Sequence, residues 1–115
     1  MDIFEMKFSK VFPLLIAKAV RKGRTEGEVF AVTGWLTGYS EEELRALLGS
    51  DSATYGEFLE KAPCMNPERF LVKGKICGIR VEEIEEPRMR DLRILDKLVD
   101  DLAKGKPLDK ILPKA

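Results

Sequence analysis

The chain has 115 residues, of which 44% are hydrophobic, and this length and composition are typical of one small globular domain. Twenty basic and twenty acidic residues cancel, so no net charge draws the whole molecule toward nucleic acid or an anionic membrane. Because the chain contains no histidine, His-ligated metal sites and nucleophiles activated by histidine are excluded.

The amino terminus, MDIFEMKFSK, is not typical of a secretory signal, because no positive cluster precedes a long apolar run. No apolar run anywhere in the chain approaches the length that crosses a membrane. We therefore expect a cytoplasmic protein. In that compartment Cys64 and Cys77 are expected to be reduced, packed thiols rather than a disulfide.

The first predicted helix is capped by Ser9 and runs through Lys22, where Gly23 ends it. Pro13 lies close enough to the first turn that its missing amide hydrogen costs little. Residues 7–24 contain six basic side chains and no acidic one, so this part of the chain is locally positive. The apolar surface of this helix comes from Val11, Leu14, Leu15, Ala17 and Val20.

Three capping boxes predict where the next three helices begin. In a capping box, a Ser or Thr side chain and a Glu three residues later each accept a hydrogen bond from the other residue's free backbone amide. The pairs are Thr25 with Glu28, Ser40 with Glu43, and Thr54 with Glu57. The corresponding helices are expected to end at Gly38, to span Glu41–Leu48, and to stop before Pro63.

Residues 67–81 are compatible with two structures. Asn66 followed by Pro67 is a typical helix start, which favours a helix over residues 67–77. Gly74 weakens that helix, and the alternation of Ile79 and Val81 about Arg80 equally suits extended chain. The pattern does not decide between helix and extended chain.

The longest helical pattern covers residues 87–105, with Pro87 at its first position and Gly105 at its end. Its apolar stripe consists of Leu92, Ile94, Leu95, Leu98, Val99 and Leu102. Lys97 is expected to be exposed on the opposite side. Asp91 lies within the apolar sector, either as a first-turn cap or as a buried partner for an arginine. We predict an all-α fold, one small multi-helix domain packed around this helix, with a single turn over residues 81–85 before it and a final turn after Pro107.

Two groups of basic residues are candidates for binding an anion. The first is a concentration of positive charge at the end of the first helix. The second contains two glycines that could let the backbone approach a phosphate, but it lacks the spacing of a known phosphate-binding loop. Capping of the helix dipole, pairing with acids, or close packing at glycine explains the same residues without a ligand. The two groups are Arg21, Lys22 and Arg24 around Gly23, and Lys73, Lys75 and Arg80 around Gly74 and Gly78.

Two further patterns suggest chemistry but have simpler explanations. Residues 25–48 have the outline of a helix-turn-helix, yet the second helix begins with three glutamates, which would repel the phosphates of DNA. Residues 82–86 include four glutamates, which could bind a hard cation or act as acid and base, although a solvated face paired with arginines is the simpler interpretation. We expect no metal and no cofactor.

A resemblance to a known family is carried by three stretches, FSKVFPLLIAKAVRKGRT, WLTGY and ICGIRVEEIEEPRMRDLRILDKLVDDLAKGK. They resemble a family of small prokaryotic proteins known as domain of unknown function 2200, and the resemblance covers nearly the whole chain. Because that family has no assigned activity, the resemblance implies a bacterial or archaeal cytoplasmic origin and supplies no catalytic residue.

The function expected from these observations is that of a non-enzymatic interaction protein. A wide apolar stripe on a small domain can exceed what its own helices cover, which favours self-association into a homo-oligomer. The alternative is a nucleic-acid-binding module that uses the basic first helix, and a third possibility is an enzyme built on carboxylates and arginines.

Overall fold

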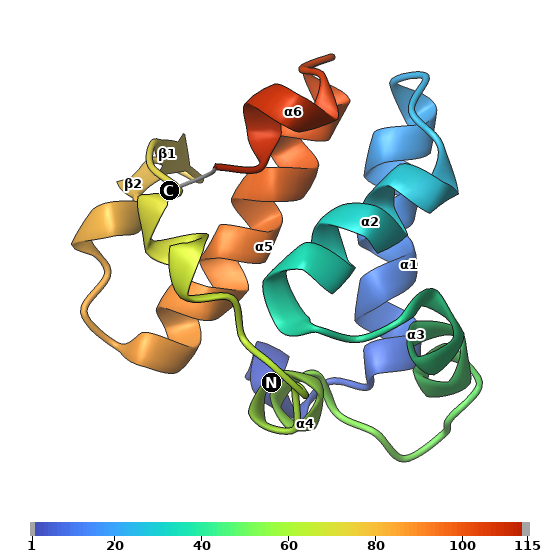
Figure 1. The fold of residues 1–115 in the computed structure, drawn as a ribbon. Coiled ribbons are helices and arrows are strands. Elements are labelled where there is room, and N and C mark those ends of the chain that lie inside the picture. The colour runs from blue at the N-terminus through green and yellow to red at the C-terminus, as the bar shows by residue number, and fades with distance from the viewer. Residues whose placement is uncertain (1, 114–115) are drawn as a thin grey trace.

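The fold is built around α5 (Pro87–Ala103), as the sequence predicts. In the computed structural model, which describes residues 2–113, helices surround α5 and the only strands among those residues form one small hairpin (Figure 1). The elements before α5 are η1 (Ile3–Glu5), α1 (Phe8–Arg21), α2 (Glu26–Thr37), α3 (Glu41–Leu48), α4 (Tyr55–Glu60), η2 (Pro67–Leu71), β1 (Lys75–Ile76), β2 (Ile79–Arg80) and η3 (Val81–Glu83). The last element is α6 (Leu108–Ile111). The all-α prediction is confirmed.

All three predicted capping boxes form. The side chains of Thr25, Ser40 and Thr54 each accept a hydrogen bond from the amide three residues later. The side chain of the glutamate at that position accepts a hydrogen bond from the backbone amide of the Thr or Ser. Gly38 ends α2 in the left-handed region, at φ +82°, and a Cβ there would lie 2.9 Å from the backbone nitrogen of Cys64. That position therefore needs glycine both for its conformation and for the close crossing of the chain after α4.

The first helix begins one residue before the predicted cap. Phe8 is its first residue and Lys7 its N-cap, so the prediction of Ser9 as the cap is wrong. The chain before α1 forms an antiparallel bridge with the chain before α4, in which the amide of Phe8 donates to the carbonyl of Ala53 at 2.9 Å. The start of α1 is thus fixed by a tertiary contact that the local sequence does not reveal.

The ambiguous segment of residues 67–81 contains both a short helix and a two-stranded hairpin. The helix predicted over residues 67–77 begins at Pro67 but ends at Leu71, as a short 3-10 helix. β1 and β2 then pair in antiparallel register, Lys75 with Arg80 and Ile76 with Ile79. Cys77 and Gly78, between the strands, have φ values of 54° and 79°, and positive φ at both central residues is what a type I′ hairpin turn requires.

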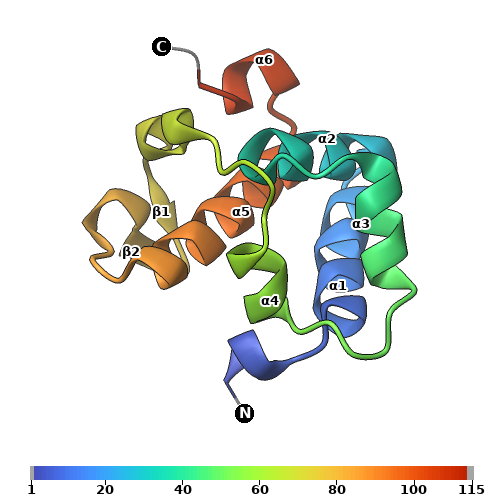
Figure 2. The ribbon, with the colours of Figure 1, turned by 60° about the horizontal axis from the view of Figure 1, so that its bottom comes forward.

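The apolar stripe of α5 is completely buried. Its six predicted members all have zero exposure, because α1, α2, α4, α6, η3 and β1 pack around the helix. Figure 2 shows α5 running between α1 on one side and the β1–β2 hairpin on the other. The expectation that this stripe exceeds what the chain itself covers is therefore wrong.

Lys97 is buried, which corrects the prediction that it is exposed. The residue is only 7% accessible, and its Nζ donates to Asp101 Oδ1 at 2.8 Å. Gly74, before β1, lies directly over it, since a Cβ on that glycine would be 2.8 Å from Lys97 Cε. The side of α5 that the pattern left for solvent is covered by the hairpin segment, whose extended structure the sequence did not settle.

Asp91 is the partner of an arginine, one of its two predicted roles. Arg69 Nε donates to Asp91 Oδ1 at 2.8 Å, and Arg69 Nη1 donates to the carbonyl of Asn66 at 2.9 Å. Both charged side chains are largely buried. This pair fixes η2 against the first turns of α5.

Both cysteines are free thiols, as expected, but neither is packed. Cys64 lies in the loop after α4 and Cys77 at the tip of the hairpin, and both are exposed. Within residues 2–113, no helix is both long and apolar enough to cross a membrane. The cytoplasmic location expected from the sequence stays a prediction.

Leu95→Ala and Leu102→Ala are each expected to destabilise the protein by about 2 to 5 kcal/mol, because both side chains are fully buried and their removal leaves cavities. Urea melts of each variant measure this loss. Lys10→Ala, at an exposed position of α1, is the control and should change stability by about 0.5 kcal/mol or less. Equal losses in the leucine and lysine variants would show that α5 is not the centre of the core.

Lys97→Ala is expected to destabilise the protein by about 3 to 5 kcal/mol, because it leaves a buried carboxylate without its closest cation. Replacing Lys97 and Asp101 together by Met and Leu should recover most of that stability, since no uncompensated charge then remains. Thermal melts of the two variants and the wild type provide the comparison. A Lys97→Ala variant as stable as the wild type would contradict the burial of this pair.

Candidate functional site

The six predicted anion-binding residues lie in three places rather than one site. Arg24 is a structural residue, because its Nε donates to Glu28 Oε2 at 3.1 Å and its Nη1 donates to the carbonyls of Leu102 and Lys106. It thereby joins the turn between α1 and α2 to the turn between α5 and α6. Four of the five N–H groups of this guanidinium are thus used within the protein, two of them on Glu28.

Lys73, Lys75 and Arg80 are exposed around the hairpin, and β-pairing sets Lys75 opposite Arg80. The backbone amide that a phosphate would need there, that of Gly74, already donates to Glu82 Oε1 at 3.0 Å. This hydrogen bond also lowers the pKa of Glu82. The amide of Gly74 is therefore occupied by the carboxylate of Glu82 and does not complete a phosphate site with the three cations.

Arg21 belongs to a larger surface on the outer face of α1, and Lys22 adjoins this surface as the C-cap of the helix. Six exposed residues recur there at helical spacing, and we call them the α1 surface: Lys10, Pro13, Leu14, Ala17, Val20 and Arg21. Leu14 is 65% exposed and Val20 is 48% exposed, the two largest apolar side chains of this surface. The expected apolar surface of this helix includes Leu14, Ala17 and Val20, all of which are exposed. A helical wheel places Ala17 away from the buried Phe12, whereas Leu14 follows the buried Val11 by three residues and lies near the same face.

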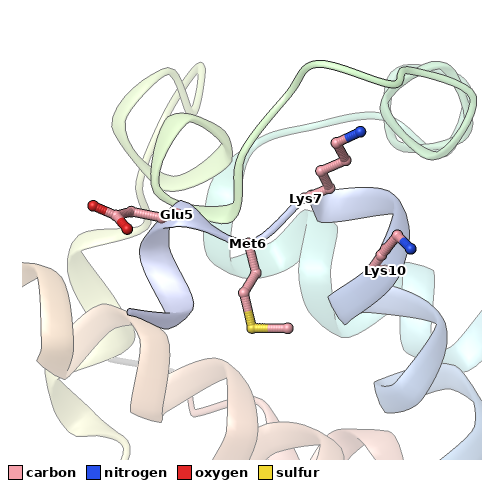
Figure 3. Close-up of a pocket in the computed structure, with 4 residues that line it drawn as sticks. All are labelled: Glu5, Met6, Lys7 and Lys10. Atoms are coloured by element: carbon pink, nitrogen blue, oxygen red, sulfur yellow. The ribbon is translucent and has the colours of Figure 1, made fainter. Parts of the chain in front are cut away.

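A pocket adjoins the α1 surface at the start of the helix. It has a volume of about 360 Å³ and is lined by Glu5, Met6, Lys7 and Lys10. Figure 3 shows the Met6 side chain extending between η1 and the first turn of α1, away from the two lysine side chains. Lys10 lines the pocket and is also part of the α1 surface, so the two are continuous. Methionine packs adaptably against apolar groups, so the pocket suits an apolar side chain.

Four of the six cations around the α1 surface have no acidic partner within residues 2–113. Of the six basic residues in 7–24, Lys18 pairs with Asp100 and Arg24 with Glu28. The other four form no ion pair with any residue in 2–113: Lys7, Lys10, Arg21 and Lys22. An exposed apolar face edged by unpaired cations is arranged to contact something apolar and acidic.

The other patterns are explained by local structure. At the start of α3, Glu41 pairs with Arg45 and Glu43 forms the capping box with Ser40. Helix capping thus accounts for these glutamates in the helix-turn-helix outline without a ligand. Glu82 accepts from Gly74, and Glu86 caps α5. No group of three potential ligands able to hold a metal ion occurs among residues 2–113.

The pair of Arg24 and Glu28 predicts a pH dependence of stability. The hydrogen bond from Arg24, aided by the amide of Thr25, lowers the pKa of Glu28 from 4.5 to about 2. A lowered pKa means that the carboxylate stabilises the fold fully above pH 4.5 and that this contribution is lost as the pH falls through about 2.

Glu28→Gln is therefore expected to be less stable than the wild type at neutral pH, with a difference that shrinks steadily as the pH falls from 4.5 toward 2. Urea melts across this pH range measure it. Glu42→Gln removes an exposed carboxylate that forms no ion pair within residues 2–113 and serves as the control. A stability difference for Glu28→Gln that is independent of pH would contradict the role of its charge.

The comparisons with known proteins agree with the fold. The crystal structure of an uncharacterized protein, SP1917, superposes with a TM-score of 0.90, at 48% sequence identity, over 97% of this chain and 93% of that one. No curated protein matches the chain significantly. The model of a family described as an uncharacterized protein conserved in bacteria, DUF2200, matches residues 2–113. The resemblance read from the sequence is thus confirmed, and the chain belongs to the DUF2200 family.

Proposed function

We propose that this protein is a non-enzymatic interaction protein whose α1 surface binds an acidic, amphipathic segment of a partner protein. The observation that carries the proposal is that exposed apolar side chains on one face of α1 lie between cations that form no ion pair with any described residue. Single exposed apolar residues are common on soluble proteins and need no explanation. Here Leu14 and Val20 share one face with Pro13 and Ala17, and the Met6 pocket extends it.

The apolar part of the surface would supply most of the binding energy. Leu14 and Val20 lie six residues apart on α1, so a partner helix laid along α1 can cover both. A bulky apolar side chain of the partner would enter the pocket beside Met6. This arrangement corresponds to recognition of an amphipathic helix through a few anchoring side chains.

The charges would select the partner and fix its orientation. Lys7 and Lys10 lie at the start of α1 and Arg21 and Lys22 at its end, so cations stand at both ends of the apolar face. Carboxylates near both ends of a partner helix would meet them. Such rim charges mainly raise the association rate and exclude partners of the same sign.

A second copy of the chain is a poorer occupant of this face. The sequence argument for self-association came from the α5 stripe, which is buried. Two α1 surfaces related by a twofold axis would set Lys10 of one copy near Arg21 of the other, which is repulsive. Self-association stays a prediction, without its original support.

Nucleic acid also fits the α1 surface less well than an acidic protein does. Phosphates would satisfy the lysines and arginines, but Leu14 and Val20 would then lose water without gaining an apolar partner. The second helix of the helix-turn-helix outline, α3, begins with three glutamates. Binding of nucleic acid is therefore an alternative outcome of the same experiment.

A photo-crosslinking amino acid at position 14 of the full chain, expressed in the bacterium it comes from, tests the proposal. We expect a protein adduct whose crosslinked segment, identified by mass spectrometry, is amphipathic and net acidic. The matched control carries the crosslinker at position 79, because Ile79 is an apolar residue of similar exposure, 51%, on the hairpin. Lys10→Glu combined with Arg21→Glu should abolish the adduct at position 14.

Each other result counts against the proposal. An adduct with the mass of two copies would show that the face is a homo-oligomer interface. An adduct removed by nuclease would favour the nucleic-acid alternative. Equal adduct yields at positions 14 and 79, or an adduct insensitive to the charge reversals, would show that the α1 surface has no specific acidic partner.

A further inference from the structure

A second pocket lies beside the last turn of α5, where three parts of the chain meet. The segment after η2 contributes Val72 and Lys73, the last turn of α5 contributes Asp101, and the turn and helix that follow contribute Lys106, Lys110 and Ile111. The pocket has a volume of about 230 Å³. Its lysines come from residues 73, 106 and 110, which are brought together only by the fold.

The described residues that line this pocket include more lysines than carboxylates. Asp101 is the one carboxylate among the described residues that line it, and the buried Lys97 already pairs with it at 2.8 Å. Lys106 Nζ lies farther from the same carboxylate, at 3.5 Å. Neither Lys73 nor Lys110 forms an ion pair with any residue in 2–113. Because Asp101 is shared between Lys97 and Lys106, the pocket keeps an excess of positive charge, carried by Lys110 and by Lys73, which also acts on the carboxylate of Glu82.

The walls of the pocket are fixed by buried contacts. Val72 and Ile111 are buried in the core, and Asp101 is held by Lys97 under Gly74. The backbone of Lys106 is held from outside the pocket, because its carbonyl accepts from Arg24 Nη1. A ligand would therefore meet lysines that extend from a preformed frame, which reduces the entropy lost on binding.

We propose that this pocket binds a small phosphorylated metabolite through its phosphate group. Three ammonium groups without a guanidinium act as point charges, which suits the compact dianion of a phosphate better than the planar, bidentate geometry of a carboxylate. The volume is below the roughly 300 Å³ at which drug-sized ligands begin to fit, and no aromatic ring among the described lining residues could stack on a base. The ligand is thus smaller than a nucleotide, and Val72 and Ile111 contact its carbon atoms.

Titration of the ¹⁵N-labelled full chain with inorganic phosphate, at constant ionic strength, tests the proposal by amide chemical shifts. We expect saturable shifts centred on residues 73, 106 and 110. Lys110→Gln and Lys73→Gln, at exposed positions where folding is not at risk, should each weaken phosphate affinity about tenfold or more, since each removes a charged hydrogen bond. Lys75→Gln, an exposed lysine two residues from Lys73 but outside the pocket, should change affinity less than about twofold.

The competing results are distinct. Shifts centred on the basic residues of the α1 surface, no saturable shift at all, or equal weakening by Lys75→Gln would each overturn the site. Succinate, a dianion of two carboxylates, serves as the matched probe, and binding as tight as that of phosphate would overturn the assignment of the ligand class.

Discussion

The structure depends on the burial of the middle and last turns of α5, where no residue from Leu92 to Leu102 is fully exposed. A helix covered to this extent buries polar residues along with its leucines, and a buried charge is tolerated only when it is neutralised. The chain meets this constraint with ion pairs along the helix, to Asp91 from Arg69, to Asp101 from Lys97, and to Asp100 from Lys18 and Lys104. These pairs also fix the surrounding elements, because Arg69 carries η2 and Lys18 carries α1 onto the same helix.

The parts of the fold that the sequence predicted are those determined locally. A capping box is complete within four residues, so the starts of α2, α3 and α4 follow from the letters alone. The start of α1 and the course of residues 67–81 depend on contacts with distant segments, and there the local pattern misled or stayed silent. The wrong prediction that Lys97 is exposed follows from the undecided structure of residues 67–81. Its burial becomes evident only once Gly74 and the hairpin are seen to cover α5.

Much the same holds for the candidate sites. Grouping basic residues by sequence found Arg21 and Lys22 at one end of the α1 surface and Lys73 at the edge of the second pocket. The same grouping included Arg24, which the fold uses as a structural tie between two turns. A wheel of α1 alone places Ala17 away from the buried side but does not decide Leu14, which follows the buried Val11 by three residues. Lys106 and Lys110 had no such signal, because only the packing of α6 beside the end of η2 places them with Lys73.

A net charge of zero conceals how the charges are divided. The buried Lys97 and the largely buried Arg24 and Arg69 are paired with carboxylates, whereas Lys7, Lys10, Arg21 and Lys22 around α1, and Lys73 and Lys110 at the second pocket, form no ion pair within residues 2–113. Exposed unpaired charges contribute little to stability, so the fold gives no reason for their clustering. Both clusters lie beside apolar side chains, Leu14 and Val20 in one case and Val72 and Ile111 in the other. Because these cations can be replaced without disturbing α5, binding and folding can be separated experimentally in this protein.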